Sequence, residues 1–393
     1  MTTVTEVPFA AAEIVPEAQQ AALRVLRSGW ITMGPETALF EADLAAYLGA
    51  RDVVAVSSCT AAIELALRAL RLPAGAPVLT PSLTFCGAVT AIVHAGLRPV
   101  LVDVDAATLL PTPATVARAA ARAGTPAAMV VQHMAGYPAD VVELAEAAGL
   151  PAGRVVEDAA HALGAALGGV PVGQRSAAAC FSFYATKNLP IGEGGAIATC
   201  DPDLAAELRT ARLHGMSRDA WRRYLPGGGW RYDVVEPGMK ANFTDIQAAI
   251  GRAQLVRLPD WQEHRERLAD RYDAELAGVE GLGLPVRPDG GRHAWHLYQI
   301  RVGRGFGKTR DEVAERLGRL GIGTSVHFIP VHRLTGFRRL LGREECAAVP
   351  VTDRVAAEVL SLPMHTALTE PAVVRVAAAL RDTATEDQRR YQC

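Results

Sequence analysis

Three short stretches of the sequence combine residue types that could do chemistry together. "SSCTAAIEL" at 57–65 is a turn of small hydroxyl residues that leads into a helical pattern. "VVEDAAHALG" at 155–164 ends an apolar run on two carboxylates, and "FSFYATKNLPIGEGGAIAT" at 181–199 places a lysine before a group of glycines. Lysine is strongly hydrated and is rarely buried unless the fold uses its amine. The three stretches are therefore candidates for one shared site.

The hydroxyl turn at Ser58, Cys59 and Thr60 could bind a phosphate. The backbone N–H groups at a helix N-terminus, together with two hydroxyl side chains, suit an anion of that kind. An ordinary helix N-cap explains the same residues, so the turn alone does not decide between the two readings.

The carboxylates and the lysine also have two readings each. Glu157 and Asp158 are costly to bury without a cationic partner, and a pyridinium N–H would be one such partner, whereas a helix N-cap is the plain alternative. Lys187, on a turn in a crowded and partly apolar site, could have a lowered pKa and act as a Schiff-base amine; otherwise it is a surface lysine.

Taken together, the three stretches favour one ligand that carries a phosphate, a basic ring nitrogen and an aldehyde. Pyridoxal 5′-phosphate (PLP) has all three groups. The glycines of "GEGGAI" lack the G-x-G-x-x-G spacing of a dinucleotide loop, and "AVSSCTAA" after the first strand lacks it too, so a nicotinamide oxidoreductase is disfavoured.

Alternating short apolar runs and helical patterns predict the elements that position these residues. The pattern favours an α/β fold with a mainly parallel sheet covered on both faces, in which ligands gather at the carboxyl ends of the strands. After about residue 250 the pattern becomes α+β, beginning with one long helix-compatible stretch at 246–278, followed by a strand at 296–302 and helices at 308–322 and 370–382. We expect a large domain over 1–252 and a smaller C-terminal domain over 253–393. The expected strands of the large domain are 52–58, 76–82, 98–105, 127–136, 153–161, 178–186 and 195–200.

Composition excludes several classes of partner. The 393 residues are 50% hydrophobic and 21% charged, and the net charge of -2 gives no electrostatic case for nucleic acid or an anionic membrane. Six cysteines lie singly without metal-ligand spacing, so we expect neither a metal site nor a disulfide framework. No signal peptide and no apolar span are evident, which predicts a soluble cytoplasmic protein.

The chain resembles the DegT/StrS (DnrJ/EryC-type) family of PLP-dependent nucleotide-sugar aminotransferases from about residue 5 to 380. The resemblance is carried by "SGWITMGPETALFE", "SSCTAAIEL", "PSLTFCGAVTAI", "VEDAAHALGA", "FSFYATKNLPIGEGGAI", "RLHGM", "GMKANFTDIQAAIGRAQL", "VHFIPVH" and "LSLPMH", in the family's order. It implies fold type I of the PLP enzymes, with a large cofactor-binding domain and a smaller α+β domain.

The resemblance also implies roles for residues around the cofactor ring. Lys187 matches the lysine that bonds to the cofactor aldehyde and later moves a proton, and Asp158 matches the carboxylate that holds the pyridine nitrogen protonated. His161 matches a residue near the phenolic oxygen, whereas Phe85 and Ala160 match the residues on the two ring faces. Core packing for Phe85 and a structural role for His161 remain the alternatives.

Further matches concern the phosphate and the oligomer. Thr60 and Ser182 match phosphate contacts, and Asn242 matches an asparagine that reaches the cofactor phosphate of a neighbouring subunit, which implies an obligate homodimer. Ser182 and Asn242 could instead be turn residues.

The substrate that the resemblance implies is a nucleotide-linked keto-sugar, with L-glutamate as the amino donor and ping-pong kinetics. "GMKANFTDIQAAIG", preceded by "HGMSRDAWRRY", is more similar to the branch that aminates C4 of a 4-keto-6-deoxy sugar on TDP or UDP, for a natural-product glycoside or a surface polysaccharide. A C3 aminotransferase is the alternative. The candidate substrate contacts are Trp30, Thr32, His214, Lys240, His327 and His332.

Two other functional classes stay open beside this one. A non-catalytic regulatory relative is expected to lose the lysine, and a dehydratase on the same fold carries histidine there. The lysine at 187 disfavours both.

Overall fold

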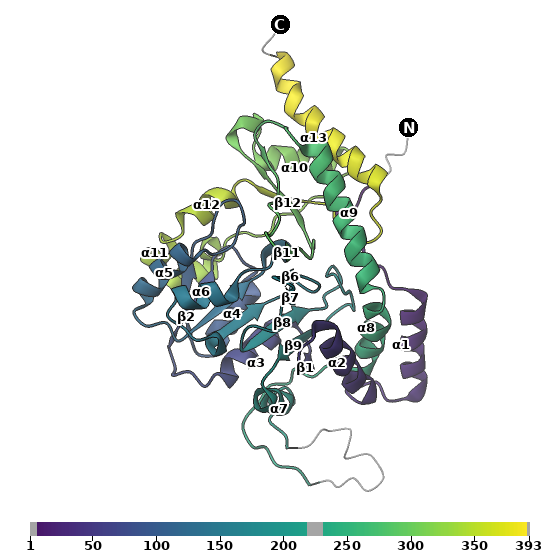
Figure 1. Ribbon diagram of the computed structural model, residues 1–393, viewed down its shortest axis with the longest axis vertical. Coiled ribbons are helices and arrows are strands. Elements are labelled where there is room, and N and C mark those ends of the chain that lie inside the picture. Colours follow the sequence, from purple (N-terminus) through teal and green to yellow (C-terminus); the bar gives the residue numbers. More distant parts are fainter. Residues whose placement is uncertain (1–5, 218–230, 391–393) are drawn as a thin grey trace.

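A seven-stranded sheet forms the centre of the molecule (Figure 1). The structure is a computed structural model that describes residues 6–217 and 231–390. The strand order is β1-β9-β8-β5-β4-β2-β3, and β9 runs antiparallel to both of its neighbours while the remaining pairs are parallel. The predicted α/β fold with a mainly parallel sheet is confirmed. The strands are β1 Asp52–Val56, β2 Pro77–Pro81, β3 Arg98–Val102, β4 Ala128–Gln132, β5 Val155–Asp158, β8 Ala178–Ser182 and β9 Gly195–Thr199.

Helices cover both faces of this sheet because successive strand side chains point to opposite sides. In β1, Val54 and Val56 pack with α3, α4 and α7, whereas Val53 and Ala55 pack with α2 on the other face. Helices α5 and α6 extend the second face over β2 and β3. These helices are α2 Pro35–Leu48, α3 Cys59–Ala69, α4 Cys86–His94, α5 Pro113–Ala123, α6 Val141–Ala147 and α7 Pro202–Ala211.

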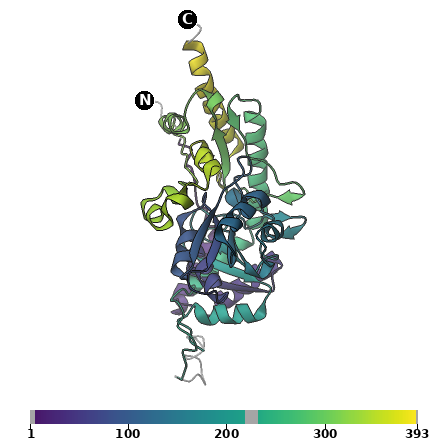
Figure 2. The ribbon, with the colours of Figure 1, turned by 90° about the vertical axis from the view of Figure 1, so that its left-hand side faces the viewer.

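A second core gathers the C-terminal part of the chain around the three-stranded antiparallel sheet β10-β12-β13. Figures 1 and 2 show α9, α10 and α13 around β12 at one end of the central sheet. The N-terminal Val7 packs into this core too, so both ends of the chain contribute to it. The elements are α9 Leu258–Leu276, β10 Leu282–Gly283, β12 Tyr298–Val302, α10 Arg310–Arg319, β13 Val359–Leu362 and α13 Glu370–Arg390.

The helix-compatible stretch over 246–278 forms two helices. Helix α8 (Asp245–Leu255) ends before α9 begins at Leu258, and Pro259 lies in the first turn of α9. Proline lacks an N–H donor and is tolerated in a first turn but not inside a helix. The expected domain boundary at 252/253 falls within α8, and the division of the chain into domains stays a prediction.

The remaining elements lie around these two cores. Helix α1 packs mainly on α8, whereas α11 packs beside β3 of the central sheet. No helix in the described parts of the chain is both long and apolar enough to cross a membrane. The remaining bounds are α1 Pro16–Ser28, β6 Ala166–Leu167, β7 Val170–Pro171, β11 Gly291–Arg292, α11 Thr335–Cys346 and α12 Pro350–Ala356.

Candidate active site

The three stretches that the sequence singled out meet at one edge of the central sheet. The register pairs Val56, at the end of β1, with Gly195 of β9, and Gly195 with Ser182, at the end of β8. One strand further, Asp158 at the end of β5 is level with Cys180 of β8. The carboxyl ends of β1, β5 and β8 therefore bring these stretches together, as expected for an α/β sheet.

Lys187 lies in the turn between β8 and β9 and is half-buried. The turn is closed by the Lys187 N–H, which donates to the Tyr184 carbonyl at 2.8 Å. Burial lowers the pKa of the Lys187 amine to about 8, although the charges of Asp158 and Cys59 act in the opposite direction. The amine is thus poised to exchange a proton near neutral pH, and its Nζ lies 3.5 Å from Nε2 of His296.

Asp158 is a buried carboxylate without a fixed cationic partner in the described part of the chain. Its Oδ1 accepts from the backbone N–H of Ala160 at 3.2 Å and lies 3.8 Å from Sγ of Cys59. Burial is the largest influence on Asp158 and raises the pKa of its carboxyl, whereas the Ala160 N–H and the charge of Lys187 act to lower it. Burial likewise raises the pKa of the Cys59 thiol well above its usual value. The carboxylate could therefore stabilise a buried cationic ring nitrogen.

His161 lies beside Lys187 with one ring nitrogen left for a ligand. Its ring centroid is 4.5 Å from that of His296 and 5.9 Å from that of Phe328. Burial holds the pKa of His161 well below its ordinary value, so the ring is neutral. Its buried Nδ1 has no hydrogen-bond partner among the described residues. A buried polar atom of this kind calls for a partner, and a ligand oxygen would provide one.

The N-terminus of α3 supplies the anion-binding geometry beside these groups. The Ser58 hydroxyl accepts from the Ala61 N–H at 3.1 Å, so this side chain caps the helix. The N–H groups of Cys59 and Thr60 precede the first bonded ones and lie at the positive end of the helix. A Cβ added to Gly195 would lie 2.5 Å from the Ser58 carbonyl carbon, so the glycine allows β9 to pass under this turn.

Phe85 begins α4 and faces the same region. Its side chain is 56% exposed, which is unusual for a phenylalanine, and its ring centroid lies 5.8 Å from that of Phe328. A Cβ added to Gly87 would lie 2.5 Å from Oγ1 of Thr60 and 3.1 Å from the Phe85 ring. This glycine therefore lets the helix starts of α3 and α4 approach each other.

The half-buried Ser182 accepts from the Tyr184 N–H at 3.4 Å through its Oγ.

A second group of predicted residues lies on two paired segments beside the end of β1. Asn242 bridges to Val56, and Lys240 is paired with Leu213, the residue before His214. Lys240 Nζ donates to Oδ1 of Asn242. Both Lys240 and His214 are exposed. The structure thus groups His214, Lys240 and Asn242 with one another rather than around the Lys187 amine.

The other candidate substrate residues are spread over three places. His327 belongs to the first group: the charge of Lys187 adds to burial in lowering its pKa to about 4, and its Nδ1 lies 2.9 Å from Oγ of Ser361. Trp30 and Thr32 lie on the turn between α1 and α2, where the Thr32 carbonyl accepts from the N–H of Asp245 at 3.2 Å.

His332 has a different setting. Its Nδ1 lies 2.7 Å from Oγ of Ser82, and its Nε2 lies 3.0 Å from Oδ1 of Asp353. Because both ring nitrogens are engaged inside the protein, the side chain ties the end of β2 to α12 and has no ring nitrogen to offer a substrate.

Sequence reasoning missed His296, Asn188 and Phe328, all of which contact the predicted residues. His296 precedes β12 in "HAWHLYQI" and reaches Lys187 from the C-terminal part of the chain. Asn188 is the neighbour of Lys187 and lies 3.1 Å from His296. For His296 the signal in the sequence was a histidine at the start of an expected strand, and that signal does not say which residue the histidine faces.

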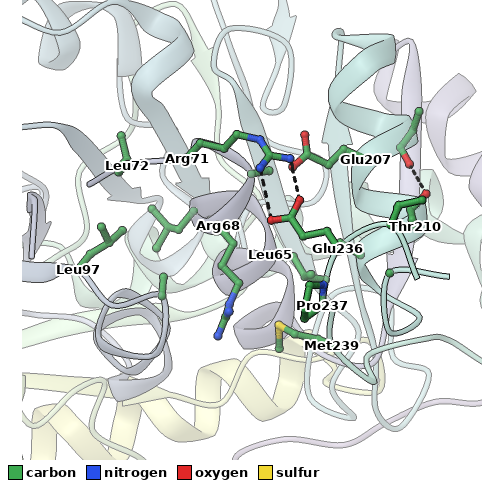
Figure 3. A pocket seen from close by; sticks show the side chains of 18 residues that line it. Leu65, Arg68, Arg71, Leu72, Leu97, Glu207, Thr210, Glu236, Pro237 and Met239 are labelled. Atoms are coloured by element: carbon green, nitrogen blue, oxygen red, sulfur yellow. Dashed lines mark hydrogen bonds and ion pairs between the residues drawn. The ribbon is translucent and has the colours of Figure 1, made fainter. Parts of the chain in front are cut away.

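One cavity of the described part of the chain lies away from this site. It has a volume of about 690 Å³ and is formed by α3, α7 and residues 235–239 (Figure 3). At its edge Arg71 pairs with Glu207 and Glu236, each at 2.9 Å. None of the predicted site residues, all within the described ranges, lines it.

Comparison with known proteins places this arrangement in a family. Residues 12–381 match the DegT/DnrJ/EryC1/StrS aminotransferase family. The chain belongs to this family. The family match confirms the resemblance found in the sequence, and with it a PLP-dependent transaminase of fold type I.

Individual relatives agree over nearly the whole chain. The spore coat polysaccharide biosynthesis protein SpsC of Bacillus subtilis is 41% identical over 377 residues, which are 95% of this chain and 96% of that protein. The sugar aminotransferase CalS13 from Micromonospora echinospora is 32% identical with a TM-score of 0.84, and the match covers 96% of this chain and 99% of that one. Spr1654 from Streptococcus pneumoniae, solved in a PMP form, is 29% identical with a TM-score of 0.87 and coverages of 97% and 99%.

The enzyme is thus a PLP-dependent aminotransferase, and Spr1654 has been solved in a PLP form as well. The residues present fit this cofactor. The unpartnered Nδ1 of His161 could meet an oxygen on the ring, and the open N-terminus of α3, which the two close-packed glycines Gly87 and Gly195 keep accessible, could hold the phosphate.

Proposed function

We propose that the protein transfers an amino group from L-glutamate to the C4 ketone of a nucleotide-linked 4-keto-6-deoxy sugar, carried on TDP or UDP. The observation that carries the proposal is the meeting of Lys187 with the buried Asp158 at one edge of the central sheet, where burial lowers the pKa of the lysine to about 8. A regulatory relative would have no use for a buried amine poised in this way, because burying a cation costs free energy.

The roles of the residues around the cofactor follow from their positions. The cofactor, when bound, supplies an electron sink that makes the α-proton of the substrate acidic. Asp158, at the end of β5, would accept the N–H of the pyridine ring and keep that nitrogen charged. His161 would meet the phenolic oxygen, Phe85 and Ala160 would flank the ring, and the phosphate would lie against Ser58, Cys59, Thr60 and Ser182.

Lys187 would act as the proton carrier in both halves of the reaction. Its amine would remove a proton from the donor carbon and deliver it to the carbon that was the aldehyde of the cofactor, and it would do the reverse with the keto-sugar. A general base works best with a pKa near the working pH, and burial brings the pKa of Lys187 from 10.5 to about 8. Because both substrates would use this one amine in turn, the kinetics would be ping-pong.

The sugar nucleotide would lie against residues from several segments. Lys240 is exposed and hydrogen-bonded to Asn242, so it presents a cation that suits a diphosphate. His327 faces Lys187 and could contact the sugar near the reacting carbon. Trp30, Thr32 and His214 complete the proposed set, from which we omit His332 because its ring nitrogens are engaged.

We also propose a cytoplasmic homodimer in which Asn242 reaches the cofactor phosphate of a second copy. Asn242 and Lys240 lie on an exposed segment beside the end of β1, where a second chain could be contacted. The similarity to SpsC, a spore coat polysaccharide biosynthesis protein, favours an amino sugar for a surface polysaccharide over one for a natural-product glycoside such as an antibiotic.

One experiment separates the proposed activity from the C3 alternative. The purified enzyme with PLP and glutamate is offered TDP- and UDP-linked 4-keto-6-deoxy sugars and, separately, the corresponding 3-keto sugars, and the products are analysed by NMR. Amination at C4 alone supports the proposal. Amination of only the 3-keto sugars would overturn the C4 assignment while leaving the aminotransferase in place.

A further inference from the structure

His296 touches the reactive lysine at one ring nitrogen and its sequence neighbour at the other. Nε2 of His296 lies 3.5 Å from Nζ of Lys187, at the outer limit of a hydrogen bond. Nδ1 lies 3.1 Å from Oδ1 of Asn188. Two consecutive residues of the turn after β8 therefore hold both nitrogens of one histidine that comes from the C-terminal part of the chain.

Asn188 determines which nitrogen of His296 carries the proton. The amide Nδ2 of Asn188 donates to the carbonyl of Ala294 at 2.7 Å, which leaves its Oδ1 as an acceptor for the histidine. An amide oxygen only accepts, so Nδ1 of His296 must be the donor. In a neutral imidazole the other nitrogen then carries a lone pair, and here that lone pair faces Lys187.

The surroundings keep this imidazole neutral. Burial is the largest cause that holds the pKa of His296 well below its ordinary value, and the charge of Lys187 acts in the same direction. His161 and Arg265 add to this effect. A neutral ring with so low a pKa accepts an N–H from the lysine but does not take its proton.

The backbone before His296 is fixed in an uncommon conformation. Trp295 has a φ of 45°, which a bulky residue adopts only where its surroundings enforce it. The buried Arg265 donates to the Trp295 carbonyl at 3.0 Å, the Trp295 N–H donates to Nδ1 of His293 at 2.8 Å, and the indole N–H donates to Glu266 at 2.7 Å. Three hydrogen bonds therefore fix the conformation of Trp295, and with it the position of His296.

A glycine on a third segment makes room for this arrangement. Gly136, in the short helix η1 (Met134–Gly136), has a φ of 102°. A Cβ at this position would lie 2.8 Å from the carbonyl oxygen of His161 and 2.9 Å from Cβ of Ala294. The tilted contact between the rings of His161 and His296 depends on this close approach.

We propose that His296 is a positioning residue for the transamination: its neutral Nε2 accepts an N–H of Lys187 and holds that amine in place whenever it is not bonded to the cofactor, while Asn188 fixes the ring's tautomer. The proposal goes beyond the established family activity and rests only on the proposed role of Lys187.

The titratable groups that face the Lys187 amine either raise its pKa or are neutral. Asp158 and Cys59 raise the pKa of Lys187 against the effect of burial. Burial holds the pKa values of His161, His296 and His327 low, so these three rings are neutral around it. A neutral acceptor binds an ammonium more strongly than an amine, and losing one should lower the pKa of the lysine further.

The test is the pKa of Lys187 in cofactor-free protein, measured from the pH dependence of its acylation rate by peptide mass spectrometry. In His296→Leu we expect a fall of about half a pH unit or more below the wild-type value, since charge-assisted hydrogen bonds are roughly twice as strong as neutral ones. His296→Gln offers an amide oxygen at the same place and should recover much of the difference. Lys308, in the same digest, is the internal reference and should not shift.

Two results would overturn the proposal. If the apparent pKa of Lys187 in His296→Leu equals or exceeds the wild-type value, the imidazole does not hold the ammonium as a neutral acceptor. If His296→Gln falls as far as His296→Leu, the effect comes from packing rather than from an acceptor. Neither result bears on whether the enzyme is an aminotransferase, because the measurement uses no substrate.

Discussion

A cation lies near each end of helix α3, and the two cations differ in burial and in the direction in which their pKa is shifted. Near its N-terminus lies Lys187, buried and close to Asp158, with a pKa lowered to about 8. Just beyond its C-terminus lies Arg71, whose side chain is 60% exposed and pairs with Glu207 and Glu236 at the cavity of Figure 3. There the hydrogen bond with Glu236 is the largest cause that raises the pKa of Arg71.

The difference shows what marks a reactive site in this molecule. A cation in water between two carboxylates stays charged and has no proton to exchange near neutral pH. A buried amine whose neighbours compensate it only in part is ready to lose its proton, which is the property that acid–base catalysis needs. Cavity volume does not distinguish the two sites, because the cavity of about 690 Å³ lies at the ion pairs of Arg71.

Replacing Lys187 should have the largest effect. We expect Lys187→Ala to lower the rate of amino transfer by about 10³-fold or more, because the proposed proton carrier is lost. Steady-state assays with glutamate and a keto-sugar would measure this rate. Arg71→Ala is the matched control and should change the rate less than about twofold. A large loss of activity in Arg71→Ala would break the contrast between the two sites.

Removing the charge of Asp158 should come next. Asp158→Asn keeps the shape of the side chain but cannot balance a charged ring nitrogen, so kcat should fall by about 10²–10³-fold, as for other buried electrostatic contacts. The KM for glutamate should change much less than kcat. A variant with unchanged kcat would show that the carboxylate does not act on the cofactor ring.

The buried amine should also lower the stability of the folded protein below about pH 8, and this cost should disappear as the pH rises to 10.5. Between about pH 8 and 10.5 the folded Lys187 has lost a proton that the unfolded chain still binds, so stability rises with pH there. Cofactor-free Lys187→Met should be more stable than wild type by on the order of 3 kcal/mol at pH 7, and the gap should close toward pH 10.5. Urea denaturation at several pH values measures the gap.

Arg71→Met serves as the control for that titration. The guanidinium stays charged throughout this window, so the stability difference between Arg71→Met and wild type should not depend on pH there. A pH dependence equal to that of Lys187→Met would assign the effect to something other than the buried amine.

A smaller effect tests the backbone behind the site. Gly136→Ala should destabilise the protein by about 2 kcal/mol or more, because the new Cβ meets the His161 carbonyl and Ala294 in addition to the strain of a positive φ. Gly149→Ala is matched to it, with a φ of +68° and nothing within 4 Å, and should cost only about 1 kcal/mol. Equal losses in thermal denaturation would refute the close-approach argument.

The sequence predicted the parts of this site that lie where strands end. The predicted strands 52–58, 153–161 and 178–186 run two to four residues past the observed ends of β1, β5 and β8 at Val56, Asp158 and Ser182. Parallel strands nevertheless bring such ends to one edge of the sheet. Their order in the sheet and the reversal of β9 could not be predicted, because periodicity does not report which strands pair. The break between α8 and α9 was signalled only by Pro259, within an otherwise continuous helical pattern.

His296 shows why the rest escaped sequence reasoning. Its contact with Lys187 joins positions 109 residues apart and depends on the unusual φ of Trp295 and on the carbonyl of Ala294 that orients Asn188. No local pattern encodes such a meeting, since it results from packing between the two cores. His332 illustrates the opposite case: a motif histidine whose role in the fold, between Ser82 and Asp353, appears only once its neighbours are known.

The most direct test of the account is to find which lysine carries the cofactor. The chain's lysines are Lys187, Lys240 and Lys308, so reduction of the PLP-loaded protein with borohydride and peptide mapping gives an unambiguous answer. The account predicts the phosphopyridoxyl label on Lys187 alone and no label in Lys187→Ala. A label on Lys240 or Lys308, or none in the wild type, would contradict it.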